Sequence, residues 1–254
     1  MTIWDEIKES FREGSSLTRL IYINLGVFLL IRILNVFYFL SGEPFPFLDW
    51  LSLPADFESL ASRPWTLITY MFLHFDFIHI LFNLLWLFWM GQIFLTYFNQ
   101  RKLVIIYLLG GIFGGIFYLA GFNSFPVFHE MVSDSRLLGA SASVIAIVIA
   151  LAIHAPNHPI SLMFIGEVKM KFIALFSVLM YIIGISSTNA GGNLAHLGGA
   201  FAGIVYVLQI RHDANSKSPN AFFNRLTGIF KPKSKVRLSY KKPTDDIEYN
   251  RQKN

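Results

Sequence analysis

Two residues that could do chemistry together lie in strongly apolar surroundings. Ser141 stands in the small-residue run 139–143, and His196 stands in the run 195–199, which is also rich in small residues. A hydroxyl or an imidazole costs several kcal/mol in hydrocarbon unless it finds a partner or lines a wet cavity. A serine activated by a histidine is a nucleophile, so this pair predicts nucleophilic catalysis at membrane depth.

The composition places these residues in a membrane protein. Of 254 residues, 54% are hydrophobic and only 15% are charged, whereas a soluble domain has roughly 25% charged residues. The chain has no cysteine. Disulfides, thiolate nucleophiles and cysteine-bound metals are therefore excluded, and the catalytic chemistry must come from other groups.

Six apolar segments could position the two residues. Several approach the length of about 20 residues that spans the hydrocarbon core, whereas the fourth and fifth are shorter. We therefore expect an all-α, polytopic membrane protein built as a bundle of six transmembrane helices. The predicted segments are Leu20–Leu40, Phe77–Phe98, Leu103–Phe122, Gly139–His154, Phe172–Ile185 with its flanks, and Asn193–Ile210.

The distribution of charge predicts the orientation. The loop 41–76 contains one base, Arg63, against five acidic residues, while Arg101, Lys102, Lys169, Lys171 and the C-terminal tail hold bases elsewhere. Because cytoplasmic loops carry an excess of Lys and Arg, the loop 41–76 is expected outside and both termini in the cytoplasm. Residues 1–18 lack the apolar core of a signal peptide.

Three regions follow from this organisation. Residues 1–18 form a cytoplasmic amphipathic segment, residues 19–212 a membrane domain, and residues 213–254 a basic cytoplasmic tail. From Arg211 onward the chain has 11 Lys or Arg against four Asp or Glu. This charge favours contact with anionic lipid, and nucleic-acid binding is not expected because no folded recognition module surrounds it.

Unusual polar residues from three spans converge on one layer of the membrane. With the predicted orientation, the second, fourth and sixth spans all run inward, and His79, Ser141 and His196 lie in their first or second turns. His196, Gly199 and Gly203 share one helical face, which lets another backbone come close. Since Ala142, Ala146 and Ala150 form a matching stripe, the fourth and sixth helices should pack closely and bring Ser141 to His196.

These motifs resemble the rhomboid family of intramembrane serine proteases, in its six-helix bacterial type. The resemblance covers roughly Trp65 to Ile210 and rests on three motifs: Gly139–Ala142, Ala195-His196 followed by Gly199 and Gly203, and His79–Trp86. It implies a rhomboid-like bundle with a membrane-associated first loop. It also implies that the protein lies in a bacterial inner membrane. It also implies cleavage of transmembrane-protein substrates.

The resemblance implies a role for each site residue. Ser141 would be the nucleophile and His196 the general base, in a dyad without an acid. His79 and Asn83, one turn apart on one face, would stabilise the oxyanion together with the Ser141 backbone. Asn83 is the stronger candidate of the two. Gly139, Gly199 and Gly203 would allow close helix packing at the site.

Other interpretations remain open at this stage. Ser143 is a competing nucleophile, serine can be a mere packing residue in a membrane helix, and His79 with Asn83 could form interhelical hydrogen bonds. A catalytically silent rhomboid-like protein that binds membrane clients is the main functional alternative, and a small-solute transporter is a more distant one. No cofactor and no metal are expected, because the sequence has no H-E-x-x-H motif. The oligomeric state is not predicted.

Several positions depart from the family or lack an assigned role. Ile145 stands where many relatives have an aromatic residue that supports the histidine ring, so His196 must be held in another way. Residues 186–193 are expected to form a flexible cap loop over the dyad. The remaining histidines, including His74, are assigned no role because solvated histidines are the default in loops. Arg32 lies within the first span without an evident partner.

Overall fold

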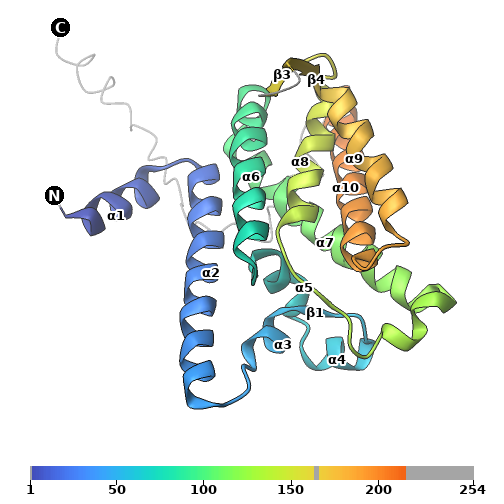
Figure 1. Ribbon diagram of the computed structural model, residues 1–254. Coiled ribbons are helices and arrows are strands. Elements are labelled where there is room, and N and C mark those ends of the chain that lie inside the picture. Colours follow the sequence, from blue (N-terminus) through green and yellow to red (C-terminus); the bar gives the residue numbers. More distant parts are fainter. Residues whose placement is uncertain (1, 163–165, 216–254) are drawn as a thin grey trace, which may run out of the picture. The chain divides into compact units, whose positions relative to one another are not determined.

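The computed structural model describes residues 2–162 and 166–215 (Figure 1). Within these ranges the chain forms six apolar helices, as the sequence predicts. In this part of the chain, four helices are long and apolar enough to cross a membrane, and two apolar helices are shorter. The prediction of an all-α polytopic membrane bundle is confirmed. The long helices are α2 (Ser16–Ser41), α6 (Phe77–Tyr97), α7 (Gln100–Ser124) and α10 (Ala190–Asn215), and the short ones are α8 (Ser141–His154) and α9 (Met170–Gly184).

Short elements occupy the ends and the loops. An amphipathic helix, α1 (Ile3–Glu13), precedes the bundle, and a hairpin of β3 (Pro159–Leu162) and β4 (Gly166–Lys169) joins α8 to α9. The first loop contains α3 (Phe47–Leu51), α4 (Phe57–Ser62), α5 (Thr66–Thr69) and the 3-10 helix η1 (Tyr70–Phe72). A second 3-10 helix, η2 (Pro126–Met131), follows α7.

A two-residue antiparallel pairing ties the first loop to the segment that leads into α8. Leu53 and Pro54 of β1 (Leu53–Pro54) lie opposite Leu137 and Arg136 of β2 (Arg136–Leu137). Arg136 adds an ion pair with Asp49 at 3.3 Å. The first loop is thus a folded layer at the end of the bundle where α8 begins (Figure 1).

Helix α8 lies in the core of the bundle, where glycines of the neighbouring helices allow them to pack closely against it. Residues 142–151 of α8 are all buried. A Cβ added to Gly199 of α10 would lie 2.2 Å from the Ala142 carbonyl oxygen, and one added to Gly110 of α7 would lie 2.6 Å from the Ala146 Cβ. Without Cβ atoms at these places, backbones approach closely and van der Waals packing stabilises the bundle.

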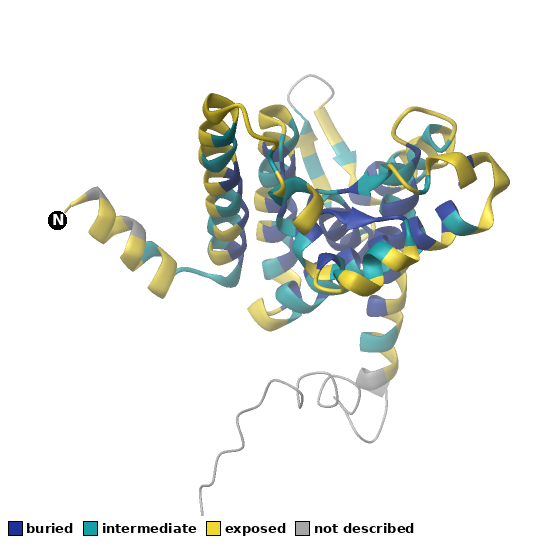
Figure 2. Ribbon diagram, turned by 90° about the horizontal axis from the view of Figure 1, so that it is seen from below, coloured by how far each residue is buried: buried dark blue, intermediate teal, exposed yellow. Residues whose placement is uncertain are grey.

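The outer faces of the other helices carry exposed apolar side chains. Figure 2 shows buried residues gathered inside the bundle and exposed ones on its outer surfaces. Examples are Phe37 of α2, Trp89 of α6 and Phe176 of α9, which are 64%, 52% and 65% exposed. In water such surfaces would aggregate, but lipid tails solvate them, so these faces suit an integral membrane protein.

Two polar side chains of α2, Asn24 and Arg32, have partners from other parts of the chain. Asn24 of α2 is fully buried and its amide donates to the Tyr107 hydroxyl at 3.0 Å, while that hydroxyl donates to the Met71 carbonyl oxygen at 3.1 Å. Arg32, exposed on α2, places its guanidinium 4.8 Å from the centre of the Phe75 ring. The structure therefore supplies the partner for Arg32 that the sequence did not reveal.

Residues 1–211 belong to one compact unit, whose described part contains the bundle, α1 and the first loop. Most of the predicted basic tail 213–254 lies outside the described residues, and its assignment as a separate region stays a prediction, as does that of residues 1–18.

Candidate active site

Ser141 is the first residue of α8 and follows a tightly held turn. Gly139 has a φ of +117°, a conformation that L side chains rarely adopt, and a Cβ there would lie 2.7 Å from the His79 ring. The Gly139 N–H donates to the Tyr70 carbonyl oxygen at 2.9 Å. Glycine is therefore required at this position, and the turn fixes where α8 begins.

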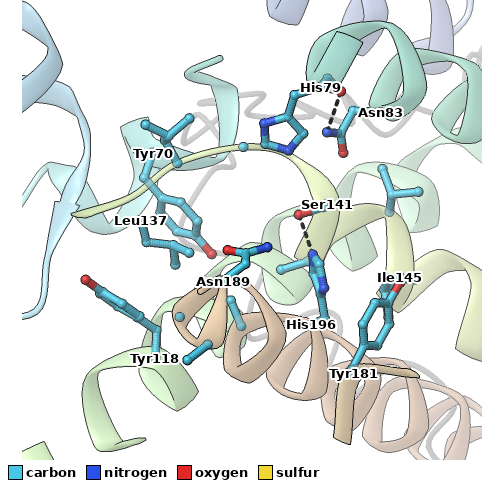
Figure 3. Close-up of a pocket in the computed structure, with 18 of the residues that line it drawn as sticks. Tyr70, His79, Asn83, Tyr118, Leu137, Ser141, Ile145, Tyr181, Asn189 and His196 are labelled. Carbon is cyan, nitrogen blue, oxygen red and sulfur yellow. Dashed lines mark hydrogen bonds between the residues drawn. The ribbon is translucent and has the colours of Figure 1, made fainter. Parts of the chain in front are cut away.

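The serine and the histidine meet. The Ser141 Oγ and the His196 Nε2 are 2.7 Å apart (Figure 3). His196 lies in the second turn of α10, and Gly199 on the same face touches the backbone of α8, so the small residues let the two helices come within side-chain reach. The geometry is that of a nucleophile beside its general base.

Ser143, the competing nucleophile, points elsewhere. It is fully buried, and its Oγ has no hydrogen-bond partner among the described residues. Its Oγ faces Gly111 of α7, where an added Cβ would lie 3.0 Å away. Ser143 does not line the cavity that contains Ser141, so Ser141 is the serine that a substrate could reach.

His79 and Asn83 lie on the same side of this cavity as Ser141. Both line it, and Figure 3 shows both side chains from α6 above Ser141. The Asn83 amide donates to the His79 carbonyl oxygen at 2.9 Å, which leaves a second amide hydrogen for another acceptor. The His79 ring packs on Gly139, in the turn that precedes Ser141.

His74 corrects the expectation of a solvated loop histidine. Its side chain is fully buried, and its Nε2 accepts a hydrogen bond from the Ala140 N–H at 3.2 Å. The ring also lies 5.4 Å from the His79 ring in an edge-to-face arrangement. The sequence did not reveal the role of His74, because this residue belongs to no helical or strand periodicity. Its contacts depend on how the first loop folds over α8.

The cavity around the dyad measures about 790 Å³ and joins several elements. Its walls include Phe82 and Trp86 of α6 and Ser177 of α9, and it extends to Tyr118 of α7 and Leu137 of β2. Asn189, in the connection between α9 and α10, points into it beside the dyad (Figure 3). The site therefore has room for a peptide segment and for water, whose share of liquid volume is about 30 Å³.

The connection between α9 and α10, which the sequence predicts as a cap loop over residues 186–193, is shorter than expected. Helix α10 begins at Ala190, so residues 190–193 are helical rather than part of a flexible connection. The Asn193 amide donates to the carbonyl oxygens of Gly184 at 2.7 Å and Asn189 at 3.0 Å. These bonds tie the end of α9 to the start of α10, which leaves five residues, 185–189, to form the connection.

Within the described residues, no group of three or more His, Cys, Asp or Glu side chains could hold a metal ion. The site consists of a hydroxyl, an imidazole and nearby hydrogen-bond donors. These groups suffice for acyl transfer.

The Rhomboid domain model matches residues 61–212, more than half of the chain. The chain belongs to the rhomboid family. RHOMBOID-like protein 12, mitochondrial, of Arabidopsis thaliana is 27% identical over 217 residues, covering 82% of this chain and 62% of that protein. Rhomboid protease GlpG of Yersinia pseudotuberculosis is 26% identical over 190 residues, covering 72% of this chain and 60% of that protein. The chain thus spans about 60% of the length of these two relatives.

This rhomboid departs from the expected pattern around His196. Ile145, one turn after Ser141, is aliphatic and lines the cavity. An aromatic ring nevertheless lies against the imidazole: the centre of the Tyr181 ring, on α9, is 4.3 Å from that of His196. Sequence reasoning missed Tyr181 because a single tyrosine in an apolar helix has no motif around it.

Proposed function

We propose that this rhomboid is an intramembrane serine endopeptidase that uses Ser141 as nucleophile and His196 as general base. The observation that carries the proposal is the 2.7 Å contact between the Ser141 Oγ and the His196 Nε2 inside a cavity of about 790 Å³. The name of the Yersinia relative, a rhomboid protease, agrees with this activity.

The reaction would proceed through an acyl-enzyme. The Ser141 Oγ attacks the scissile carbonyl carbon while its proton passes to the His196 Nε2. As the tetrahedral intermediate collapses, the C–N bond breaks and His196 gives that proton to the leaving amine. A water molecule, deprotonated by His196, then attacks the Ser141 ester, and collapse of the second intermediate returns the proton to Ser141.

Oxyanion stabilisation is assigned to the N-terminal end of α8 and to α6. Negative charge that develops on the carbonyl oxygen needs donors, because the low dielectric of the bundle makes an unpaired charge costly. The Ser141 N–H lies at the N-terminal end of α8, where backbone N–H groups have no partner within the helix and the helix dipole favours an anion. The free amide hydrogen of Asn83 and the half-buried His79 ring face the same cavity.

The substrates would be transmembrane proteins that enter from the lipid. The cavity is walled by α6 and α9 at Phe82, Trp86 and Ser177, and Phe82 is itself 56% exposed on the outer face of α6. A helical peptide bond is shielded by its own hydrogen bonds and must unwind locally before attack. The preferred substrate is therefore a single-pass helix with weak helix formers near the cut.

The test compares wild type with Ser141→Ala and with Ser143→Ala as the matched control, all purified in detergent. Wild type and Ser143→Ala should cleave a helical transmembrane model substrate and react with a fluorophosphonate, whereas Ser141→Ala should do neither. Equal cleavage by Ser141→Ala would reject the proposal. A wild type that neither cleaves nor labels, yet binds the substrate, would support the client-binding alternative.

A further inference from the structure

The proposed base has one hydrogen bond and no second polar partner. The His196 Nδ1 is buried and has no hydrogen-bond partner among the described residues. The helices that contact the imidazole, α8 and α9, contain no Asp or Glu. In hydrolases with a serine and a histidine, an acid usually holds the imidazole in the correct orientation. Here another group must prevent the ring from turning away from Ser141.

The Tyr181 ring is in the right place for this. Its centre lies 4.3 Å from the centre of the imidazole, with an angle of 51° between the two planes. Figure 3 shows the tyrosine beside His196, on the side away from His79 and Asn83. The imidazole is thus held by Ser141 at one nitrogen and by an aromatic ring against its plane.

The aromatic contact has a chemical consequence as well as a steric one. When His196 accepts the serine proton it becomes a cation, and a cation near an aromatic ring is attracted by the negative face of that ring. The attraction is strongest where water is excluded, and the Nδ1 side of the partly buried imidazole is shielded from water. A ring in this place therefore favours the protonated intermediate as well as the correct orientation.

Tyr181 also connects the base to the half of α9 in which no residue is fully buried. The buried residues of α9 are Met170, Ile173 and Ala174, all in its first half, while Leu179, Ile182 and Ile183 in its second half are exposed. Tyr181 is partly buried and turns from this second half toward the dyad. The position of α9 thus decides whether the imidazole keeps its support.

We infer that Tyr181 is a positioning residue whose ring, delivered by α9, holds the His196 imidazole in place for proton transfer. This inference rests on the proposed function. It assigns to α9 the support that the aliphatic Ile145 on α8 does not give. Tyr181 acts through His196 and forms no bond with the reacting atoms.

The test removes the ring and then restores it. Tyr181→Leu should lower kcat roughly 10- to 30-fold with little change in KM, because the lost contact acts on the protonated base and not on substrate binding. Tyr181→Phe should restore kcat to within about twofold of wild type, since it keeps the ring and removes only the hydroxyl. Phe176→Leu is the matched control, as it makes the same type of change on the exposed face of α9.

Each variant is also followed by thermal unfolding and by its rate of fluorophosphonate labelling. Slower labelling by folded Tyr181→Leu, with Tyr181→Phe and Phe176→Leu near wild type, supports the inference. Wild-type kcat in Tyr181→Leu, or a change in KM alone, overturns it. Should Tyr181→Leu unfold, Tyr181→Met, which fills more of the same volume, is measured in its place with the same criteria.

Failure of this inference is distinct from failure of the proposed function. If Ser141→Ala abolishes cleavage but Tyr181→Leu retains full kcat, the dyad stands and the ring has no role in it. If Ser141→Ala cleaves like wild type, the proposed dyad fails and the role of Tyr181 fails with it.

Discussion

The peptide before Ser141 is held by three residues from the first loop and α6. Tyr70 accepts from the Gly139 N–H, His74 accepts from the Ala140 N–H, and the His79 ring packs on Gly139. Ser141 is therefore positioned by contacts that come from distant parts of the chain, and these contacts can be tested one at a time.

Replacing His74 should loosen this turn. His74→Ala leaves the Ala140 N–H without its acceptor in a fully buried place, which costs about 1–3 kcal/mol. We expect a lower unfolding temperature and a lower kcat, measured by thermal unfolding in detergent and by cleavage of the model substrate. His129→Ala, at an exposed histidine of η2, is the control and should match wild type. Unchanged stability and kcat in His74→Ala would contradict the role given to this bond.

Replacing Asn83 separates its two interpretations. If Asn83 stabilises the oxyanion, Asn83→Ala should lower kcat on the order of 100-fold with KM nearly unchanged. If the residue only holds α6 in the bundle, the unfolding temperature should fall while kcat of the folded protein is retained. Steady-state kinetics and thermal unfolding of the same preparation decide between the two outcomes.

Among single residues, sequence reasoning located those that belong to motifs and missed those that act through tertiary contact. The approach of Ser141 to His196 was predictable because polar groups at membrane depth are unusual and because their neighbours are small. His74 was missed because its contact with Ala140 depends on the fold of the first loop. Tyr181 was missed because its contact with His196 depends on the placement of α9.

At the scale of helices, the contact between α8 and α10 sets the distance between Ser141 and His196. A Cβ on Gly199 would lie 2.2 Å from the Ala142 carbonyl oxygen, closer than atoms can approach. Gly199→Ala should therefore push the helices apart, lower stability by about 1–3 kcal/mol and reduce cleavage. Denaturant-induced unfolding and the cleavage rate measure both effects.

Gly26 provides the matched control for that substitution. It lies within α2, and an added Cβ would have nothing within 4 Å. Gly26→Ala should therefore leave activity unchanged and stability equal or slightly higher, because alanine has the better helix propensity. Equal loss in both variants would indicate that any glycine replacement harms the protein, and the close contact at Gly199 would lose its special role.

The helices themselves were predictable, but one boundary was not. All six spans follow from the apolar pattern, because a membrane leaves few alternatives to the helix. The start of α10 was placed too late, since Gly191 and Gly192 read as a flexible loop. In the structure a Cβ on Gly191 would lie 2.9 Å from the Tyr118 ring, so this glycine permits close packing within a helix.

For the whole molecule, the absence of cysteine makes the predicted orientation directly testable. Glu58→Cys in the first loop and Glu167→Cys in the β3–β4 hairpin are matched changes at exposed positions. A membrane-impermeant maleimide should label the first in intact cells and the second only after the membrane is opened. The opposite pattern would invert the proposed topology and place both termini outside the cytoplasm.

The short length of α9 has a consequence for the surrounding bilayer. Its 15 residues span about 23 Å, whereas the hydrocarbon core measures about 30 Å. Buried α8 is shielded by protein, but α9 presents Phe176 and Ile183 to the acyl chains. The lipids on that flank must compress or tilt to match it, while those beside α2 need not. This uneven match to the bilayer favours thin membranes. It also makes the position of α9, which carries Tyr181, sensitive to the length of the acyl chains.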